Sequence, residues 1–248
     1  MRGATDVCGC FPTGRHYPGI ADRLSKSLDE VVGLAAGFAP TSPWVDHPIV
    51  VIDFETTGVD STVDRVIEIG LVGFRRGEVE FREALLVQPG IPIPEDSRAI
   101  HGITDEELEG APPFAEIVGR VKELLEGHLP VAYNASFDRG FLMQEMRRAG
   151  ALGGPLPPAL TEGVEWIDPL VWAREILKDQ KSKRLGDVAV TLGVPLERAH
   201  RAAGDAEATG RVLYALAKQM PAAYGELVRV QGRYAAFQDA ERSRFRKT

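Results

Sequence analysis

The feature that most constrains the fold is a continuous apolar run from Pro48 to Ile52 that ends at Asp53-Phe54-Glu55. A run that is apolar at every position and rich in β-branched residues is typical of a strand buried on both faces at the centre of a sheet. Charges at the end of such a strand are costly to shield unless something pairs with them. The run therefore predicts a covered sheet whose central strand delivers two acids to its end.

The rest of the middle region predicts a mixed sheet covered by helices. Strands are expected over 66–74 and 79–87, joined by an Arg75-Arg76-Gly77 turn, over 130–133, and through Trp166 and Ile167. Helices are expected over 114–126, 137–148 with Ser136 as N-cap, 170–177, 185–192 and 206–219. Three consecutive strands followed by alternating strands and helices indicate an α/β layered domain with five strands.

The two ends of the chain differ from this core domain, which we place at 47–220. In the N-terminal extension, 1–46, a helical stripe formed by Ile20, Leu24, Leu28, Val31 and Ala35 predicts one amphipathic helix, and 37–43 reads as a linker. That helix either docks on its own core or binds a protein partner. The C-terminal segment, 221–248, predicts a helix over 222–247 with a basic end that either touches a nucleic-acid backbone or is a solvated tail.

Charge and hydropathy narrow the class of protein. The formal net charge of −7 speaks against a nucleic-acid partner, but two divalent cations in an acidic site would bring the total to −3. No apolar run approaches the roughly 18 residues that cross a bilayer, and the start lacks the apolar stretch of a secretory signal. We therefore expect a soluble, cytoplasmic protein without membrane contact.

The two cysteines, Cys8 and Cys10, lie close together in a Gly-rich segment and are a poor basis for a disulfide framework. With His16 they make three candidate ligands, whereas a structural zinc site normally needs four. The segment is better read as an exposed tail.

Four acids and one histidine lie at or near the ends of predicted strands and helices, which suggests a shared site without deciding it. Asp53 and Glu55 lie two apart on a strand, so both side chains point to one face and can converge on one metal ion. Asp138 is expected in the first turn of a helix, and Asp205 is expected to begin another, five residues after His200. Taken singly, each has a structural explanation, such as an acid that stabilises a helix N-terminus. Their joint spacing does not.

Five sequence elements occur in a fixed order over residues 48–220. They are Asp53 to Gly58, His101-Gly102-Ile103-Thr104, Asn134 to Asp138, Asp168-Pro169-Leu170, and His200 to Thr209. This set resembles the DEDDh exonucleases, the superfamily that includes the proofreading epsilon subunit of bacterial DNA polymerase III, ribonuclease T and oligoribonuclease. The resemblance implies a ribonuclease-H-like fold, a mixed five-stranded sheet flanked by helices, with 47–220 as the exonuclease domain.

Two departures from the family pattern leave the acids untouched, and the second of them bears on partners. Tyr133 stands where many relatives have a histidine before the Asn, which leaves the acids untouched. The epsilon subunit's polymerase-binding tail and clamp-binding motif have no counterpart after Met220, so association with a polymerase is not supported.

The activity that the resemblance implies is 3′ to 5′ exonucleolytic hydrolysis of single-stranded nucleic acid, which releases nucleoside 5′-monophosphates. DNA is favoured as substrate because the epsilon-like His101 to Thr104 element is present. The alternatives are an exoribonuclease that trims RNA and an inactive nucleic-acid-binding domain.

The same resemblance assigns a role to each site residue. Asp53 is expected to bridge two Mg²⁺ ions, for which Mn²⁺ can substitute, while Glu55 and Asp205 complete the first ion and Asp138 holds the second. His200 is expected to act as general base toward the attacking water. Substrate contacts are expected from Thr56, Thr57, His101, Asn134 and Phe137, with Phe54 and Phe137 either stacking on the terminal base or lying in the core.

Overall fold

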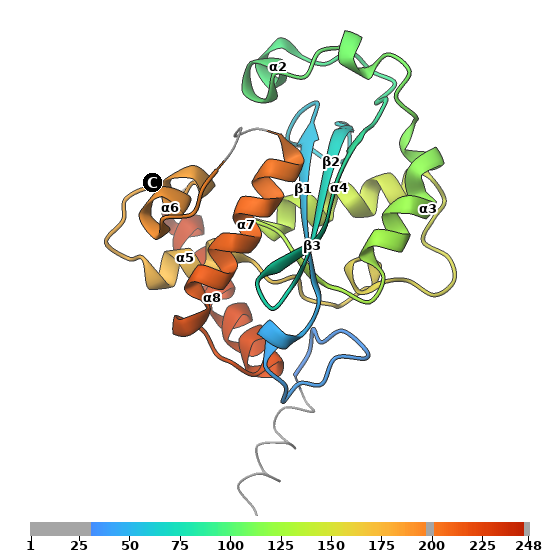
Figure 1. Cartoon of the computed structure of the whole chain (residues 1–248). Helices are drawn as coiled ribbons and strands as arrows, with labels where there is room; N and C mark the ends of the chain where they lie inside the picture. The colour runs from blue at the N-terminus through green and yellow to red at the C-terminus, as the bar shows by residue number, and fades with distance from the viewer. Residues whose placement is uncertain (1–30, 197–200, 246–248) are drawn as a thin grey trace, which may run out of the picture.

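The computed structural model describes residues 31–196 and 201–245 (Figure 1). Several predicted features lie outside these residues. They are Cys8, Cys10 and His16, most of the predicted N-terminal helix, His200, and the basic residues Arg246 and Lys247.

At the centre lies a four-stranded mixed sheet in the order β3-β2-β1-β4. The strands are β1 (Ile49–Thr56), β2 (Val66–Arg75), β3 (Glu78–Leu86) and β4 (Leu129–Val131). β2 runs antiparallel to both β1 and β3, whereas β4 runs parallel to β1. Between β2 and β3 the turn residues Arg76 and Gly77 have φ values of 53° and 87°, which suit a tight hairpin. The predicted α/β architecture and its opening hairpin are confirmed.

The fifth predicted strand is wrong, because Ile167 makes only an isolated parallel bridge with Val131. Two causes stop the ladder from growing. On one side the Glu165 N–H donates to the Gly33 carbonyl at 2.8 Å and is not available to β4. On the other side Asp168 is already the N-cap of a helix whose first residue is Pro169.

Helices cover both faces of the sheet (Figure 1). One face carries α5 (Pro169–Ile176), α6 (Leu185–Leu192), α7 (Ala202–Leu216) and α8 (Tyr224–Phe245); the other carries α3 (Phe114–Leu125) and α4 (Ala135–Arg148). The unpredicted α2 (Glu95–His101) lies beyond the C-terminal end of β1. Short 3₁₀ turns occupy Trp44–Asp46, Glu106–Leu108, Pro158–Leu160 and Ala217–Gln219.

Side chains along β1 alternate between the two helical layers. Ile49 and Val51 pack in the cluster on the α7 side, whereas Val50, Ile52 and Phe54 pack in the cluster under α3 and α4. The period of two continues to the end of the strand, so the two acids after Ile52 alternate with Phe54 and fall on the α7 side.

α7 sits very close to the sheet because two glycines leave room for it. A Cβ at Gly70, the β2 partner of Asp53, would lie 2.2 Å from the backbone of Ala202. A Cβ at Gly210 on α7 would lie 2.3 Å from the ring of Phe74. α7 is therefore pressed against β1 and β2, with its first turn beside Gly70 and Asp53.

Two helices begin earlier than predicted, since distant carboxylates cap them. α4 begins at Ala135, with Asn134 and not Ser136 as N-cap, because the Asp168 carboxylate accepts hydrogen bonds from the N–H groups of Asn134 and Ala135, both at 3.0 Å. α7 begins at Ala202, whose N–H donates to Glu68 at 3.0 Å.

The segment before β1 packs against the start of α8. Ala35 N–H donates to the Tyr224 hydroxyl at 3.0 Å, and Trp44, only 1% exposed, donates its N–H to the Ala222 carbonyl at 2.9 Å. The predicted helix is wrong over 31–35, where the chain turns at Gly33 with φ 101°, a conformation that ends a helix.

None of the helices in the described part of the chain combines the length and the apolar composition that crossing a bilayer requires.

Candidate metal centre

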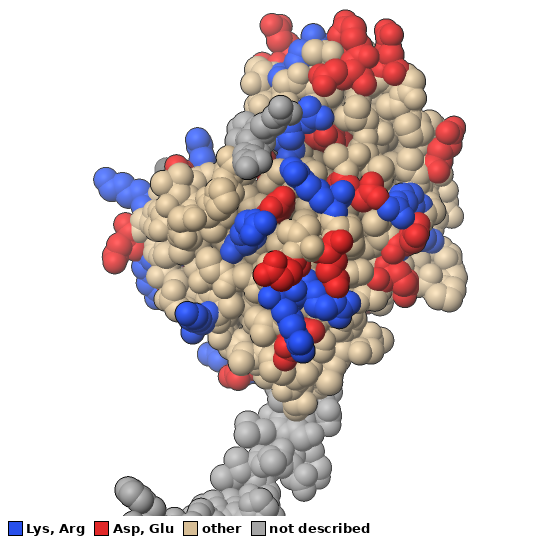
Figure 2. Space-filling model, in the orientation of Figure 1, with Lys and Arg blue, Asp and Glu red and all other residues tan. Residues whose placement is uncertain are grey.

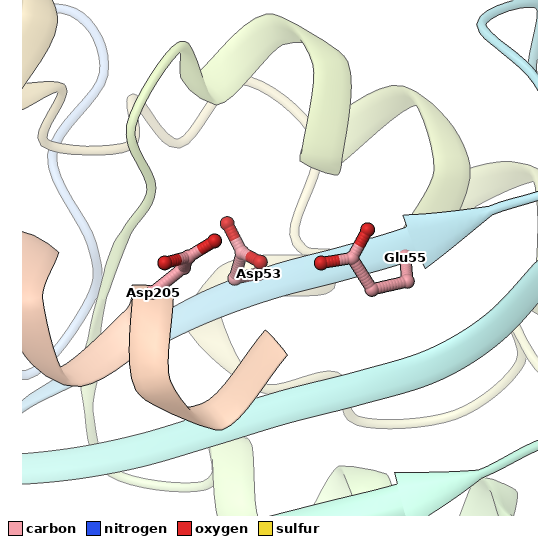
Figure 3. A group of neighbouring side chains, drawn as sticks. All are labelled: Asp53, Glu55 and Asp205. Carbon is pink, nitrogen blue, oxygen red and sulfur yellow. The ribbon is translucent and has the colours of Figure 1, made fainter. Parts of the chain in front are cut away.

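Three carboxylates converge at the end of β1 (Figure 3). Asp53 and Glu55 point from β1 to the α7 face, and Asp205 reaches them from the first turn of α7. One oxygen of each lies within 4.8 Å of an oxygen of the others. The helix and the strand thus bring acids 150 positions apart in sequence to one point.

Asp138 completes the acidic site from the other side. It lies in the first turn of α4, is 3% exposed, and acts on Asp53 more strongly than any other charge does. Its oxygens do not belong to the three-carboxylate group. Asp138 is therefore close enough to act on Asp53 but lies outside the group of three carboxylates.

The site is electrostatically strained without a cation. Burial, and then the charges of Asp138 and Asp205, raise the pKa of Asp53 well above its usual range. Burial and the charges of Asp205 and Glu68 raise the pKa of Glu55 to about 8. Carboxylate oxygens crowded in this way are the donor set that hard divalent cations prefer, so the residues fit such an ion.

Glu68 is an acid that the sequence motifs did not indicate. It lies opposite Glu55 on β2 and is 1% exposed. Its carboxylate accepts a hydrogen bond from the Arg201 guanidinium at 2.8 Å and from the Ala202 N–H. A single charge in the otherwise apolar strand from Val66 to Ile69 was the signal that could have identified it. Glu68 therefore ties the start of α7 to the sheet.

Asp168, predicted only as part of a family motif, has a clear structural role. Besides the two N–H groups at the start of α4, its carboxylate accepts the Leu170 N–H at 2.9 Å in α5. One carboxylate thus caps two helices, and one of them carries Asp138.

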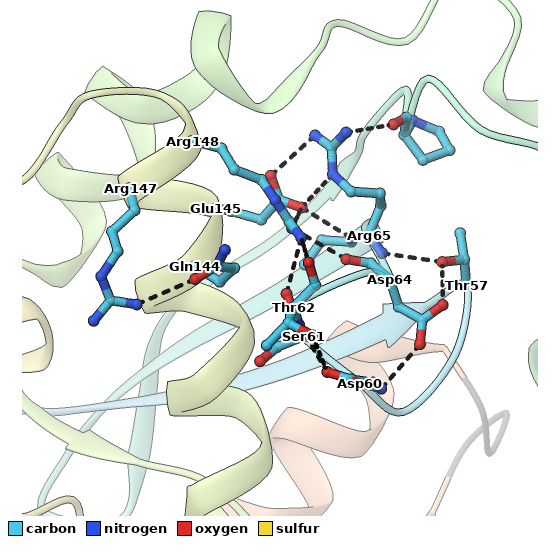
Figure 4. A network of polar contacts seen from close by, with 12 residues as sticks. Thr57, Asp60, Ser61, Thr62, Asp64, Arg65, Gln144, Glu145, Arg147 and Arg148 are labelled. Atoms are coloured by element: carbon cyan, nitrogen blue, oxygen red, sulfur yellow. Dashed lines mark hydrogen bonds and ion pairs between the residues drawn. The ribbon is translucent and has the colours of Figure 1, made fainter.

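The loop after β1 is held by its own polar network (Figure 4). The Thr56 hydroxyl donates to the Gly58 carbonyl at 2.6 Å, and the Thr57 hydroxyl donates to Asp64 at 3.2 Å. Behind them Arg148 donates to the carbonyls of Ser61, Thr62 and Asp64. The two threonine hydroxyls predicted to bind substrate are engaged in shaping this loop.

The predicted substrate residues are distributed around the acids. His101, 6% exposed at the end of α2, accepts the Ile103 N–H on Nδ1, and burial lowers its pKa, which favours the neutral ring. Asn134 is exposed, while Phe137 is half-buried with its ring centroid 4.9 Å from that of Phe141. Phe54 is buried in the core under α4, on the face away from the carboxylates.

His200, the predicted general base, lies outside the described residues, just before Arg201 and Ala202.

Comparison with known proteins gives a family match. The model of the RNase_T family, described as Exonuclease, matches residues 50–213. DNA polymerase III PolC-type of Streptococcus suis is 35% identical over 175 residues, and the protein of that name from Thermotoga maritima is 33% identical over 202 residues. These matches cover 70% and 82% of this chain but only 11% and 14% of the relatives, so the chain spans a small part of their length.

Solved structures share the fold. Exonuclease X in complex with 5′ overhanging duplex DNA matches with a TM-score of 0.56 at 23% identity, over 74% of this chain and 99% of that one. E. coli Exonuclease I in complex with an oligonucleotide matches with a TM-score of 0.58 at 20% identity, over 69% and 41%. A 3′-exonuclease that recognises a histone mRNA stem-loop matches with a TM-score of 0.59 at 19% identity, over 70% and 82%. The predicted ribonuclease-H-like fold is thereby confirmed.

Proposed function

Since the chain belongs to the exonuclease family, we propose that it removes nucleotides from the 3′ end of single-stranded nucleic acid with the help of divalent metal ions. The observation that carries this proposal is the convergence of Asp53, Glu55 and Asp205, whose carboxylate oxygens lie within 4.8 Å of one another. Bound cations allow such crowded carboxylates to be ionised at neutral pH, and phosphodiester hydrolysis is a reaction that cations promote.

The carboxylates would divide the work of holding two Mg²⁺ ions. Asp53 belongs to the three-carboxylate group with Glu55 and Asp205, and the charge of Asp138 acts on it more strongly than any other charge, which supports its assignment as the bridging ligand. When bound, two such ions supply activation of a water and stabilisation of charge on the leaving 3′ oxygen. Mn²⁺ accepts the same oxygen donors and is expected to substitute.

Other groups of the chain would handle the proton and the substrate. We assign His200 as the general base because it precedes Asp205 by five residues and because imidazole groups in general exchange a proton near neutral pH. We assign contacts with the terminal nucleotide to His101, whose lowered pKa favours a neutral ring, and to the exposed Asn134, four residues before Asp138. The domain that carries these residues is 47–220, and DNA is the favoured polymer.

The test is digestion of DNA and RNA oligonucleotides of matched sequence, each labelled at the 5′ end, with Mg²⁺ or Mn²⁺. A ladder that shortens from the 3′ end, with nucleoside 5′-monophosphates as products, is the expected result. Faster loss of the RNA would favour the exoribonuclease alternative. No cleavage of either polymer would refute the proposed activity and favour a binding domain.

A further inference from the structure

Two adjoining cavities flank the start of α4. The first, of about 760 Å³, is lined by Asp205 of the carboxylate cluster together with Arg174 and Arg242. The second, of about 870 Å³, follows α4. Asn134, Arg174 and Arg242 line both. The cavities therefore form one trough that leads from the acids past two arginines.

The two arginines come from different helices and line the same two cavities. Arg174 lies on α5 and is partly buried, and its Nη1 donates to the Gln238 side chain at 3.3 Å. Burial and then the charge of Arg242, on α8, lower the pKa of Arg174. Two guanidinium groups that repel each other at the edge of a cavity gain stability when an anion binds between them.

Most cations of the trough have no carboxylate partner among the residues that the structure describes. Several arginines on other surfaces do pair with carboxylates, as Arg75 does with Glu80 and Arg211 with Glu207. Within the described residues, Arg242 is the one cation of the trough that makes an ion pair, which is with Asp239. The trough cations without an ion pair in this part of the chain are Arg139, Arg147, Arg174, Lys183 and Arg184.

Besides Asp205 the trough contains five acids, Glu162, Glu165, Asp168, Asp187 and Asp239, of which three are already engaged. Asp168 accepts three backbone N–H groups, Asp187 bonds the Ser182 hydroxyl, and Asp239 pairs with Arg242. The opposite side of the site is different. Acidic side chains gather on the segment of α2 and the turn after it, where Glu95, Asp96, Glu106 and Glu107 lie (Figure 2). The phosphates of a strand that leaves the site would be repelled there and would be attracted to the arginines of the trough.

We propose that Arg174 and Arg242 bind backbone phosphates of the single strand whose 3′ end lies at the carboxylate cluster. This inference rests on the proposed function, because the trough begins at Asp205. Arg242 belongs to α8, which lies beyond the 50–213 match of the family model, so the site adds a strand-holding surface to the exonuclease domain. Guanidinium groups contact phosphates without reading bases, which suits an enzyme that accepts any sequence.

The experiment compares wild-type protein with Arg174→Gln, Arg242→Gln, the double variant, and Arg229→Gln as control. Arg229 lies on α8, as Arg242 does, but pairs with Glu226 and does not line the trough. Each protein is assayed on a single-stranded DNA of about 12 nucleotides and on the p-nitrophenyl ester of thymidine 5′-monophosphate, which has no further phosphates to contact the trough.

For the double variant we expect KM on the oligonucleotide to rise roughly tenfold or more, with kcat and hydrolysis of the small ester unchanged. The slope of log(kcat/KM) against log[salt] should become shallower by about 0.7 for each phosphate that the variant no longer binds. Arg174→Lys keeps the charge and should keep most of the salt slope, which separates phosphate binding from a packing role.

The outcomes separate the two proposals. If the wild type cleaves both substrates and the double variant matches it in KM and salt slope, the arginine site is refuted while the proposed function stands. An equal loss on the small ester would also overturn it, because the arginines would then act on folding or chemistry. If the wild type cleaves neither substrate, the proposed function fails and the arginine site with it.

Discussion

Two groups of buried carboxylates are treated in opposite ways. Glu145, 1% exposed on α4, lies between two arginines: its Oε1 is 2.7 Å from Nε of Arg65 and 2.9 Å from Nη1 of Arg148 (Figure 4). Asp53 and Glu55 lie mainly against other acids (Figure 3). The chain thus neutralises Glu145, the carboxylate that helps to hold a loop, with its own arginines. The acids at the end of β1 are left for ions from solution.

Glu68 marks the border between the two groups. It raises the pKa of Glu55 as a member of the acidic site, yet Arg201 neutralises it and the start of α7 bonds to it. Glu55 and Glu68 are opposite each other on adjacent strands, yet within the described residues only Glu68 has an arginine as its ion-pair partner. Position in the sheet therefore does not decide whether an acid is neutralised by the chain.

The largest effect should come from removing the central acid of the cluster. Asp53→Asn is expected to lower kcat by about 10³-fold or more, because the bridging charge is removed while the fold is kept. Cleavage of labelled oligonucleotides measures it, with the exposed Asp179→Asn as control. Retained activity in Asp53→Asn would show that the acids at the end of β1 do not hold the ions that the reaction needs.

Divalent ions should stabilise the protein more at high pH than at low pH. The pKa of Glu55 rises from 4.5 to about 8 in the metal-free fold, so the proton it holds contributes stability that is complete below about pH 4.5 and is lost as pH rises toward 8. An ion takes the place of that proton. At 100 times its Kd an ion adds about 3 kcal/mol.

Thermal melts with and without Mg²⁺, at about pH 5 and about pH 8, measure this difference. The shift in Tm is expected to be larger at the higher pH. Equal shifts at both pH values would show that the cluster is not the ion's site.

Glu145→Gln should destabilise the fold by roughly 2 kcal/mol, because it leaves Arg65 and Arg148 without their shared partner. The arginines are partly exposed, which keeps the effect moderate. Urea unfolding measures it, and Glu123→Gln, which removes an exposed ion pair with Arg120, should change stability by less than about 0.5 kcal/mol. A midpoint equal to that of the wild type would contradict a structural role for Glu145.

The smallest expected effect has the opposite sign. Glu55→Gln removes one of the repelling charges and should stabilise the metal-free protein by roughly 1 kcal/mol at about pH 8. The same variant should lose part of the stabilisation by Mg²⁺. If the metal-free variant were destabilised, Glu55 would be a structural acid like Glu145 and not a source of repulsion.

Local patterns were sufficient to predict the central strand and the hairpin. The β-branched run before Asp53 could form little else, and Arg76-Gly77 suits only a tight turn. The pairing of Asp53 with Glu55 on one face followed from the strand period. The family motifs then supplied Asp138, Asp205 and His200.

The errors occurred where distant residues decide local structure. Ser136 was a reasonable N-cap by sequence, but Asp168, 33 positions from Ala135, satisfies the helix start. The strand at Ile167 was cut short by a hydrogen bond to Gly33, far away in sequence. Glu145 and Arg65 are 80 positions apart, so nothing local indicated their pairing.

The close seating of α7 on Gly70 and Gly210 has a consequence for how an ion would be received. The distance between Asp205 and the acids of β1 is set by two close approaches of α7 to the sheet, one between the backbones of Ala202 and Gly70 and one between Gly210 and the ring of Phe74. The ligand cage is thus assembled when the protein folds, and ion capture adds little further ordering. A methyl group at either glycine would lift the helix and loosen the cage.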